Sequence, residues 1–263
     1  MRVSLVQMAA GLDPAENLAT IGRLLADAAA AGPDLVVLPE AVMHDFGSPD
    51  TPLGPAAEPL DGRFVSTLSA LARERGVTVV AGMFERSTDA ARPYNTLVGL
   101  GPDGSLLATY RKTHLYDSFG YRESDRLLAG PPEAVVLQVA GTQVGLMTCY
   151  DLRFPEQARA LVDAGADLLV VPAAWVAGPL KEDHWSTLLR ARAIENTAYV
   201  AAAAQCGRAY CGCSMLVDPM GVAVAALGEA EGVVTGTVDP LRLSGARDRN
   251  QALRHRRYRV VPR

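Results

Sequence analysis

Several features that would direct this chain to nucleic acid, a membrane or the cell exterior are missing from its sequence. No polybasic run occurs before the arginine-rich tail at residues 254–259, and the net charge is −4, so nucleic acid is not an expected partner. No stretch of about 18 uninterrupted apolar residues exists, so no segment is expected to span a membrane. The N-terminus lacks the longer apolar stretch and the cleavage site of a signal peptide. These absences predict a cytoplasmic protein.

Cysteine is also scarce, with four residues in the whole chain. Without a secretion signal, Cys149, Cys206, Cys211 and Cys213 are expected to be reduced rather than paired. The last three lack a convincing CxxC pair and a matched fourth ligand, which argues against zinc, and no metal or cofactor is predicted. Cys149 lies far from the other three in sequence, and that isolation makes it a candidate nucleophile.

What the chain does contain is an ordinary globular composition, with a hydrophobic fraction of 49% and a charged fraction of 21%. Its 263 residues fit a single domain at residues 1–263, because neither an internal repeat nor a low-complexity linker divides them. The first part of the chain alternates predicted strands and helices, a pattern typical of layered α/β folds. The strands are predicted at residues 3–8, 35–38 and 77–83, and the helices at residues 13–31 and 61–75.

Two predicted hairpins interrupt this alternation, because turn sequences at residues 101–104 and 140–142 each separate two apolar runs. Hairpins among βα units argue against a purely parallel Rossmann sheet or a (β/α)₈ barrel. They favour two mixed β-sheets packed face to face, with helices outside. The first hairpin is predicted to pair strands 94–100 and 106–110, and the second to pair strands 135–139 and 144–148. Two helices are predicted after them, at 155–164 and 184–196. The remaining strands are predicted at 167–171, at 199–204, on both sides of the turn at 218–221, and at 233–238. The proline-rich stretch at residues 49–59 is predicted to be one long surface loop near Glu40.

Three polar residues stand within two positions of the end of a predicted strand: Glu40, Lys112 and Cys149. Strand ends place side chains at the rim of a sheet, where functional sites form on a rigid base. A thiolate is a nucleophile, a carboxylate can remove the thiol proton, and a fixed ammonium stabilises both the thiolate and a forming oxyanion. Together the three residue types point to thiol attack on the carbonyl carbon of a small carboxamide.

Each of these residues also has an ordinary structural interpretation. Taken alone, Glu40 is a loop carboxylate, Lys112 is a solvated lysine at a strand end, and Cys149 is a small buried apolar residue. Spacing alone does not choose between the structural and the catalytic interpretations.

Three segments together resemble the nitrilase superfamily of carbon–nitrogen hydrolases. They are residues 38–40 (LPE), 110–115 (YRKTHL) and 149–156 (CYDLRFPE). Their order and strand-end context match the family, and the resemblance covers nearly the whole chain. It implies an α/β fold of the αββα sandwich type, in which two mixed β-sheets pack together with helices on the outside.

The resemblance also implies roles for single residues. Glu40 would be the general base, Lys112 the stabiliser of the oxyanion, and Cys149 the nucleophile that forms a thioester before water releases the acid. Glu123 matches a second glutamate that often follows the lysine, and it would orient Lys112 and the substrate amide; a plain loop carboxylate is the other interpretation. The backbone N–H of Tyr150, directly after the nucleophile, would be a second oxyanion donor.

The stretch at residues 149–156, together with residues 184–185, 190–196 and 204–208, resembles the branch that contains omega-amidase and deaminated-glutathione amidase. Tyr-Asp follows the cysteine where true nitrilases usually carry Trp-Glu, which favours an amide over a nitrile. Substrates of this branch carry a carboxylate, which Arg153 is predicted to bind in a bidentate pair; a salt bridge from Arg153 to Asp151 or Glu156 is the alternative. The chain departs from the branch at Cys213, where histidine is usual, and at Met220, where tryptophan is usual.

The predicted function is hydrolysis of a small carboxylate-bearing carboxamide to an acid and ammonia. Deaminated glutathione and an omega-amide of a 2-oxo acid are the candidate substrates. Two alternatives stay open: the same residues could act on carbamoyl or aliphatic amides, or the fold could serve as a non-catalytic binding module. The two departures leave room for a binding module, whereas the presence of all three central residues argues against it. The resemblance also implies a homodimer or a larger homo-oligomer.

Overall fold

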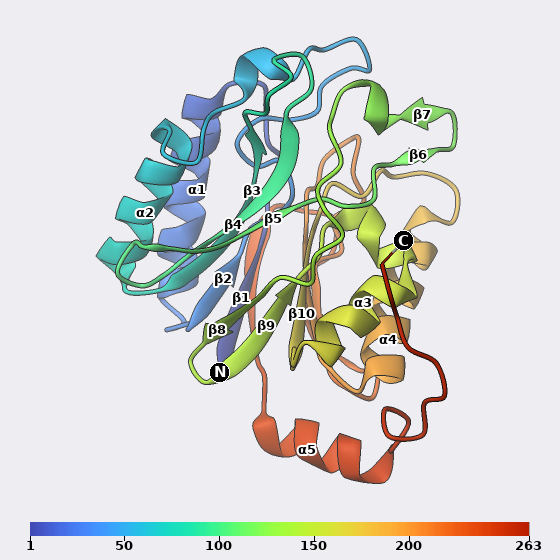
Figure 1. Cartoon of the computed structure of the whole chain (residues 1–263). Helices are drawn as coiled ribbons and strands as arrows, with labels where there is room; N and C mark the ends of the chain where they lie inside the picture. Colours follow the sequence, from blue (N-terminus) through green and yellow to red (C-terminus); the bar gives the residue numbers. More distant parts are fainter. Residues whose placement is uncertain (263) are drawn as a thin grey trace.

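The computed structural model describes residues 1–262 and contains two six-stranded mixed sheets that pack face to face (Figure 1). The first sheet has the order β14 (Gly232–Thr237), β1 (Arg2–Gln7), β2 (Leu35–Val37), β3 (Thr78–Glu85), β4 (Tyr94–Leu100) and β5 (Leu106–Arg111). The second has the order β13 (Ala223–Ala226), β12 (Met215–Val217), β11 (Tyr199–Ala204), β10 (Leu168–Ala173), β9 (Thr142–Leu146) and β8 (Val136–Val139).

Each sheet has a parallel centre and antiparallel edges. Strands β1, β2 and β3 run parallel in the first sheet, and β9, β10 and β11 do so in the second. The two predicted hairpins are present as the antiparallel pairs β4–β5 and β8–β9. The parallel strands of both sheets end in the same region of the molecule, since a parallel bridge joins Met8, directly after β1, to Gln205, directly after β11.

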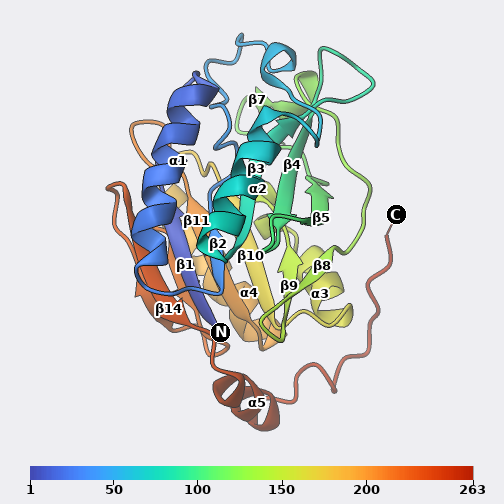
Figure 2. The same cartoon turned by 90° about the vertical axis from the view of Figure 1, so that its left-hand side faces the viewer.

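Four helices cover the outer faces of the sandwich. Helices α1 (Pro14–Ala29) and α2 (Arg63–Arg75) lie against the first sheet (Figure 2), and α3 (Pro155–Asp163) and α4 (Lys181–Asn196) lie against the second. The start of α1 follows the predicted signals, since Asp13 accepts a hydrogen bond from the N–H of Ala15 at 2.8 Å and Pro14 occupies the first turn. The predicted αββα sandwich is therefore confirmed.

The alternation of side chains along the strands divides the core into layers. In β1, Leu5 points between the two sheets, whereas Val6 points toward α1 and α2. In β10, Val170 joins the layer between the sheets and Val171 joins the layer under α3 and α4. Because β10 is buried on both faces, its sequence LLVVPA is continuously apolar rather than alternating. The central part of β1 is buried too, but it includes Ser4, whose hydroxyl is hydrogen-bonded to that of Thr235 at 2.7 Å.

Some elements differ from the sequence-based predictions. The short hairpin of β6 (Asp117–Ser118) and β7 (Tyr121–Arg122) and the C-terminal helix α5 (Pro240–Arg249) were not predicted. Helix α4 begins three residues earlier than expected, at Lys181. The stretch at residues 49–59 is largely irregular, as predicted, but it contains the short 3₁₀ helix η1 (Gly54–Ala56). Within residues 1–262, no helix is long and apolar enough to cross a membrane.

Candidate active site

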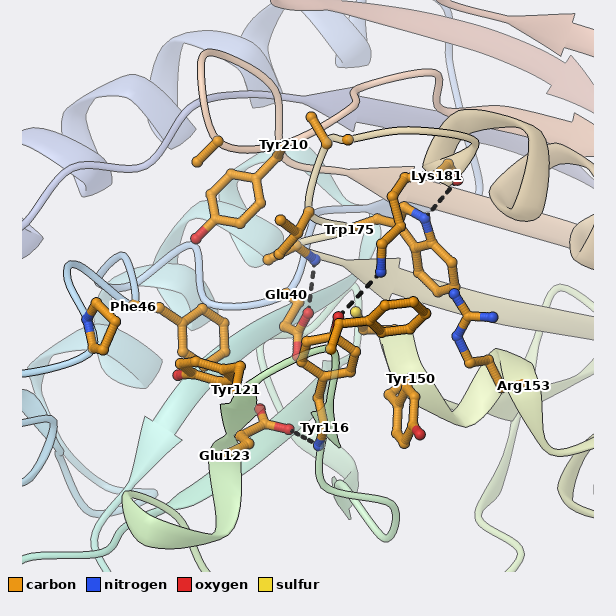
Figure 3. Close-up of a pocket in the computed structure, with 18 of the residues that line it drawn as sticks. Glu40, Phe46, Tyr116, Tyr121, Glu123, Tyr150, Arg153, Trp175, Lys181 and Tyr210 are labelled. Atoms are coloured by element: carbon orange, nitrogen blue, oxygen red, sulfur yellow. Dashed lines mark hydrogen bonds between the residues drawn. The ribbon is translucent and has the colours of Figure 1, made fainter.

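A cavity of about 420 Å³ opens where strands of both sheets end, and all six predicted site residues line it. Glu40 follows β2, Lys112 follows β5, and Cys149 begins the 3₁₀ helix η3 (Cys149–Arg153) after β9. Aromatic side chains make up much of the remaining wall (Figure 3). They are Phe46, Tyr116, Phe119, Tyr121, Tyr150, Trp175 and Tyr210.

Lys112 lies between two carboxylates on the floor of this cavity. Its Nζ donates to Oε1 of Glu40 at 3.0 Å and to Oε1 of Glu123 at 2.9 Å. Lys112 is 2% exposed and Glu40 is 1% exposed. Burial opposes the charge on Lys112, but the negative charges of Glu123 and Glu40 outweigh it and raise the pKa of Lys112 well above its ordinary value. The ammonium is therefore a fixed positive charge.

Both carboxylate oxygens of Glu40 accept hydrogen bonds, and the donors belong to segments of both sheets. Oε1 accepts from Nδ2 of Asn95 at 2.7 Å, in addition to Lys112. Oε2 accepts from the backbone N–H of Ala174, just beyond β10, at 2.6 Å. The side chain of Gln205 donates to the backbone carbonyl of Glu40 at 2.9 Å. These contacts fix the carboxylate across the junction of the two sheets.

Glu123 is buried and is not a solvated loop carboxylate. It begins the 3₁₀ helix η2 (Glu123–Asp125), and its Oε2 accepts from the backbone N–H of Tyr116 at 2.5 Å. Burial raises the pKa of Glu123, and the charge of Lys112 offsets part of that rise. Glu123 therefore holds Lys112 together with Glu40, and its bond to the N–H of Tyr116 fixes the segment that carries that residue.

Cys149 lies in a tight turn between β9 and η3. Its backbone has φ 45°, a left-handed conformation that residues other than glycine rarely adopt. The residue is 8% exposed. Strain of this kind persists where surrounding contacts hold the backbone, and it is concentrated at functional sites. The turn places the thiol at the cavity floor beside Glu40 and Lys112.

The thiol of Cys149 is protonated at neutral pH in the resting site. Burial and the negative charge of Glu40 raise its pKa well above the ordinary value, and the opposing effect of Lys112 is smaller. The sequence led us to expect that Lys112 would stabilise the thiolate; Lys112 acts in that direction, but burial and the nearby carboxylates outweigh one ammonium. For this thiol to act as a nucleophile, a base would have to take its proton.

Asp151 joins the turn of Cys149 to the segment after β5. Its Oδ2 accepts from the N–H of Thr148 at 2.8 Å and from the hydroxyl of Tyr110 at 2.6 Å. Its Oδ1 accepts from the backbone N–H of His114 at 3.1 Å and lies 2.8 Å from the ring Nδ1 of His114. Because Lys112 lies between Tyr110 and His114 in the chain, this buried carboxylate sets the position of the lysine relative to the cysteine.

Arg153 reaches the cavity without an acidic partner. Its guanidinium carbon lies 4.8 Å from the ring centre of Trp175 and 5.7 Å from that of Phe119. Within residues 1–262 it forms no ion pair with Asp151 or Glu156, the alternative considered from the sequence. The other predicted binding residue, Tyr150, packs edge-on against Tyr116 and lines the same cavity.

The two departures from the family branch lie outside the cavity lining. The carbonyl of Cys213 accepts from Nε1 of Trp185 at 3.0 Å, and Met220 is a partly exposed residue of the turn between β12 and β13. All four cysteines are free. In the part of the chain that the structure describes, no group of three or more histidine, cysteine or acidic side chains is arranged to hold a metal ion.

Several residues of the site were not identified from the sequence. Asn95 is the second residue of β4, where a buried amide gives no local signal of function. Tyr116, Trp175 and Tyr210 look like ordinary aromatic residues in loops. Lys181 was not singled out, because the predicted start of its helix lay three residues further along the chain.

Comparison with known proteins agrees with this geometry. The family described as carbon-nitrogen hydrolase matches residues 2–248. A deaminated glutathione amidase from Escherichia coli O157:H7 is 43% identical over 244 residues, which are 92% of this chain and 92% of the relative.

Solved structures agree as well. A CN-hydrolase superfamily protein from Xanthomonas campestris, which carries an arsenic adduct in its active site, superposes with a TM-score of 0.89 at 33% identity, covering 100% of this chain and 99% of its own. A mutant of the amidase from Nesterenkonia sp. AN1 superposes with a TM-score of 0.81 at 28% identity, covering 98% and 94% of the two chains. That structure shows covalent addition of the acetamide moiety of fluoroacetamide at the active site cysteine.

Proposed function

This chain belongs to the carbon-nitrogen hydrolase family and is an amide-hydrolysing enzyme, and we propose that it cleaves a small carboxylate-bearing amide through a thioester on Cys149. The observation that carries this proposal is the fixed ammonium of Lys112, held by Glu40 and Glu123 on the cavity floor beside the thiol. A binding module has no need of a nucleophile, a base and a cation in one buried cluster.

In the first half of the reaction, Glu40 accepts the thiol proton as Sγ of Cys149 attacks the amide carbon. The carbonyl oxygen becomes an oxyanion, which Lys112 and the backbone N–H of Tyr150 stabilise. Two of the ammonium's three N–H groups donate to Glu40 and Glu123, so one is left for this oxygen. When the tetrahedral intermediate collapses, the C–N bond breaks, Glu40 returns the proton to the leaving amine, and a thioester remains.

The second half repeats these steps with water. Glu40 accepts a proton from a water molecule as the water oxygen attacks the thioester carbon. Lys112 and the N–H of Tyr150 again hold the oxyanion. Collapse then breaks the C–S bond, the acid leaves, and the proton returns from Glu40 to the sulfur. Each proton that Glu40 accepts is passed on, so the resting state with a protonated thiol is restored.

Arg153 is the group that we propose for the substrate carboxylate. Its charge faces aromatic rings rather than an acidic side chain, so it is free to form a bidentate pair with an incoming carboxylate. The name of the Escherichia coli relative supports deaminated glutathione as a candidate. Its scissile bond is a secondary amide, so the leaving group there is a dipeptide amine rather than the ammonia predicted from the sequence.

The test is formation of 2-oxoglutarate, the acid product shared by deaminated glutathione and alpha-ketoglutaramate. The wild type, Cys149→Ala and the matched control Cys206→Ala are compared, because Cys206 is a buried cysteine outside the cavity. We expect turnover that is lost in Cys149→Ala and retained in Cys206→Ala. A folded Cys149→Ala enzyme with normal turnover would contradict the nucleophile. Turnover of neutral aliphatic amides alone would contradict the substrate class.

We further propose that the enzyme is cytoplasmic, folds as one domain and assembles into at least a homodimer. The joint core of the two sheets supports one domain, since residues of both sheets fill the layer between them. Light scattering of the purified protein measures the assembly, and a monomer at micromolar concentration would contradict it. A single cooperative unfolding transition is the expected result for one domain.

A further inference from the structure

The basic residues of this chain are distributed unevenly between its surface and its cavity. Of the 25 basic side chains, 23 are arginine, and Lys112 and Lys181 are the two lysines. Three basic residues line the cavity: both lysines and Arg153. A chain that uses arginine almost everywhere else therefore has a lysine at two positions, both facing the same cavity. Lys112 belongs to the catalytic cluster, whereas Lys181 has no role in the reaction described above.

Lys181 is the first residue of α4, and its side chain turns into the cavity toward aromatic groups (Figure 3). Its Nζ lies 3.6 Å from the ring centre of Phe119 and donates to the hydroxyl of Tyr116 at 3.1 Å. Nε1 of Trp175 donates to the backbone carbonyl of Lys181 at 2.8 Å and fixes the start of the helix. Among residues 1–262, no acidic side chain forms an ion pair with Lys181.

Lys181 and Arg153 share the same aromatic neighbour. Both cations lie over the ring of Phe119, at 3.6 Å and 5.7 Å from its centre. Figure 3 shows these two side chains on one side of Glu40, whereas Phe46 and Tyr121 lie on the other side. Arg153 and Lys181 therefore lie together on one side of the cavity, and the carboxylate of Glu123 lies on the other.

Neither Arg153 nor Lys181 is paired with an acidic side chain of the cavity lining. The acidic residues that line the cavity are Glu40 and Glu123, and both accept a hydrogen bond from Lys112. The three cations and two carboxylates of the lining leave the cavity one net positive charge. Aromatic faces attract cations but carry no net charge, so they hold Lys181 and Arg153 in place without cancelling them. Two fixed cations in a partly enclosed, low-dielectric wall favour an anionic group between them.

We propose that Lys181 is a specificity-determining residue that binds the carboxylate end of the substrate together with Arg153. Selection of anionic over neutral acyl groups would then depend on two cations rather than on Arg153 alone. A carboxylate has two oxygens, so one can pair with the guanidinium while the other accepts from the ammonium. The inference rests on the proposed amidase function for its substrate, but not for its test, because binding is measured without turnover.

The test compares Lys181→Met with Lys181→Arg in the Cys149→Ala background, in which the amide is not cleaved. Calorimetric titration with alpha-ketoglutaramate should show about tenfold weaker binding in Lys181→Met and little change in Lys181→Arg. The matched control is Arg190→Met, which removes a positive charge from an exposed position of the same helix. Pentanamide, a neutral amide of the same acyl length, should bind the Lys181→Met protein as it binds the parent.

Two results would overturn the inference: unchanged binding of alpha-ketoglutaramate in Lys181→Met, or equal weakening of the anionic and the neutral amide. The second result would mean that Lys181 only supports the shape of the wall. Failure of the proposed function would give a different result. The wild type would then show no turnover, whether or not substitution of Lys181 changes binding.

The lysine content offers a second and independent measurement. Because Lys112 is buried, Lys181 and the N-terminal amine are the accessible targets of an amine-selective acylating reagent. We expect 2-oxoglutarate, the anionic product, to slow acylation of Lys181 severalfold, as followed by mass spectrometry, and to leave the N-terminal amine unaffected. Equal labelling of Lys181 with and without 2-oxoglutarate would contradict its contact with the carboxylate.

Discussion

The floor and the mouth of the cavity are held by different forces. We define the floor as Glu40, Lys112, Glu123 and Cys149, and the mouth as Phe119, Tyr150, Arg153 and Lys181. Every residue of the floor is buried, and its charged groups are joined by hydrogen bonds. The mouth is carried by the β6–β7 hairpin, η3 and the start of α4, and its contacts are mainly aromatic and cation–π, with Phe119 67% exposed.

This difference suggests a division of roles, in which the floor carries out the reaction and the mouth selects the substrate. A buried charge cluster tolerates little change, because removing one member leaves the others without partners in a low dielectric. Stacked and partly exposed side chains can be replaced at a smaller cost. We therefore expect substitutions in the floor to lower the turnover of every amide, and substitutions in the mouth to change the preference between anionic and neutral amides.

The largest effect is expected from Glu40→Gln. The amide keeps the size of the side chain but cannot accept the thiol proton, and general-base catalysis contributes on the order of 10²–10⁴ in rate. We expect kcat to fall at least about 10³-fold for both alpha-ketoglutaramate and a neutral amide, as measured by steady-state kinetics. A loss confined to the anionic amide would place Glu40 in substrate selection and break the division between floor and mouth.

A smaller loss is expected from Asp151→Asn, which leaves every floor residue in place. The amide cannot accept all the hydrogen bonds from Thr148, Tyr110 and His114, so one buried donor is left unpaired, at a cost of about 1–3 kcal/mol. We expect that loss of unfolding free energy in denaturant titration, with a fall in kcat of about 10–100-fold. The control is Glu156→Gln, an exposed carboxylate of α3 that should change neither quantity.

The pH dependence of the floor follows from Glu123. Because burial raises the pKa of Glu123, its carboxylate becomes protonated, and its pairing with Lys112 weakens, at a pH above the ordinary range of a glutamate. Activity should therefore fall as the pH drops through this raised value. At high pH Lys112 keeps its charge, because its pKa is raised well above the ordinary value.

The measurement is the pH profile of kcat/KM for the wild type and Glu123→Gln. We expect about a tenfold lower plateau in the variant, with the acid limb moved to lower pH because the titrating group is gone. An acid limb that stays in place in Glu123→Gln would assign it to another group.

In the mouth, Arg153→Met should act on the anionic substrate alone. Loss of the guanidinium removes a bidentate pair, so we expect KM for alpha-ketoglutaramate to rise about tenfold with a smaller change in kcat. The kcat/KM of a neutral amide should stay within about twofold. Equal losses for both amides would mean that Arg153 supports the wall rather than the carboxylate.

The smallest effect is expected from Phe119→Ala. The ring is largely exposed and holds the two cations through contacts worth about 0.5–1 kcal/mol each at exposed sites. Kinetics on alpha-ketoglutaramate should show a two- to fivefold higher KM and an unchanged kcat. A large fall in kcat would show that the β6–β7 hairpin takes part in forming the floor.

The predictions from sequence succeeded where the signal is local. Apolar runs with strong turn sequences located the central strands and both large hairpins within a few residues, because the side-chain period of a strand and the chemistry of a turn are properties of neighbouring residues. The same reasoning missed the two-residue strands β6 and β7, which are too short to show a period. It also missed α5, a polar helix with few buried residues, Leu243 and Ala246.

The site was predictable to a different degree in its two parts. Glu40, Lys112 and Cys149 were found because segments around them resemble a known family, and their strand-end positions agree with the chemistry. Asn95 and Lys181 were not found, since their importance depends on what folding brings beside them. The assignment of catalytic roles and of one domain stays a prediction, which the experiments above test.

By itself, the sequence determined the order of the main strands and helices, because these depend on local pattern, and its resemblance to a family supplied the candidates for nucleophile, base and cation. Only the tertiary structure decided how they meet. Glu40 and Lys112 are 72 residues apart, and Glu40 and Ala174 are 134 residues apart, yet both pairs are hydrogen-bonded. Burial and the residues packed around Cys149 keep its thiol protonated. Packing also leaves Arg153 and Lys181 without acidic partners. Neither property can be read from a local pattern in the sequence.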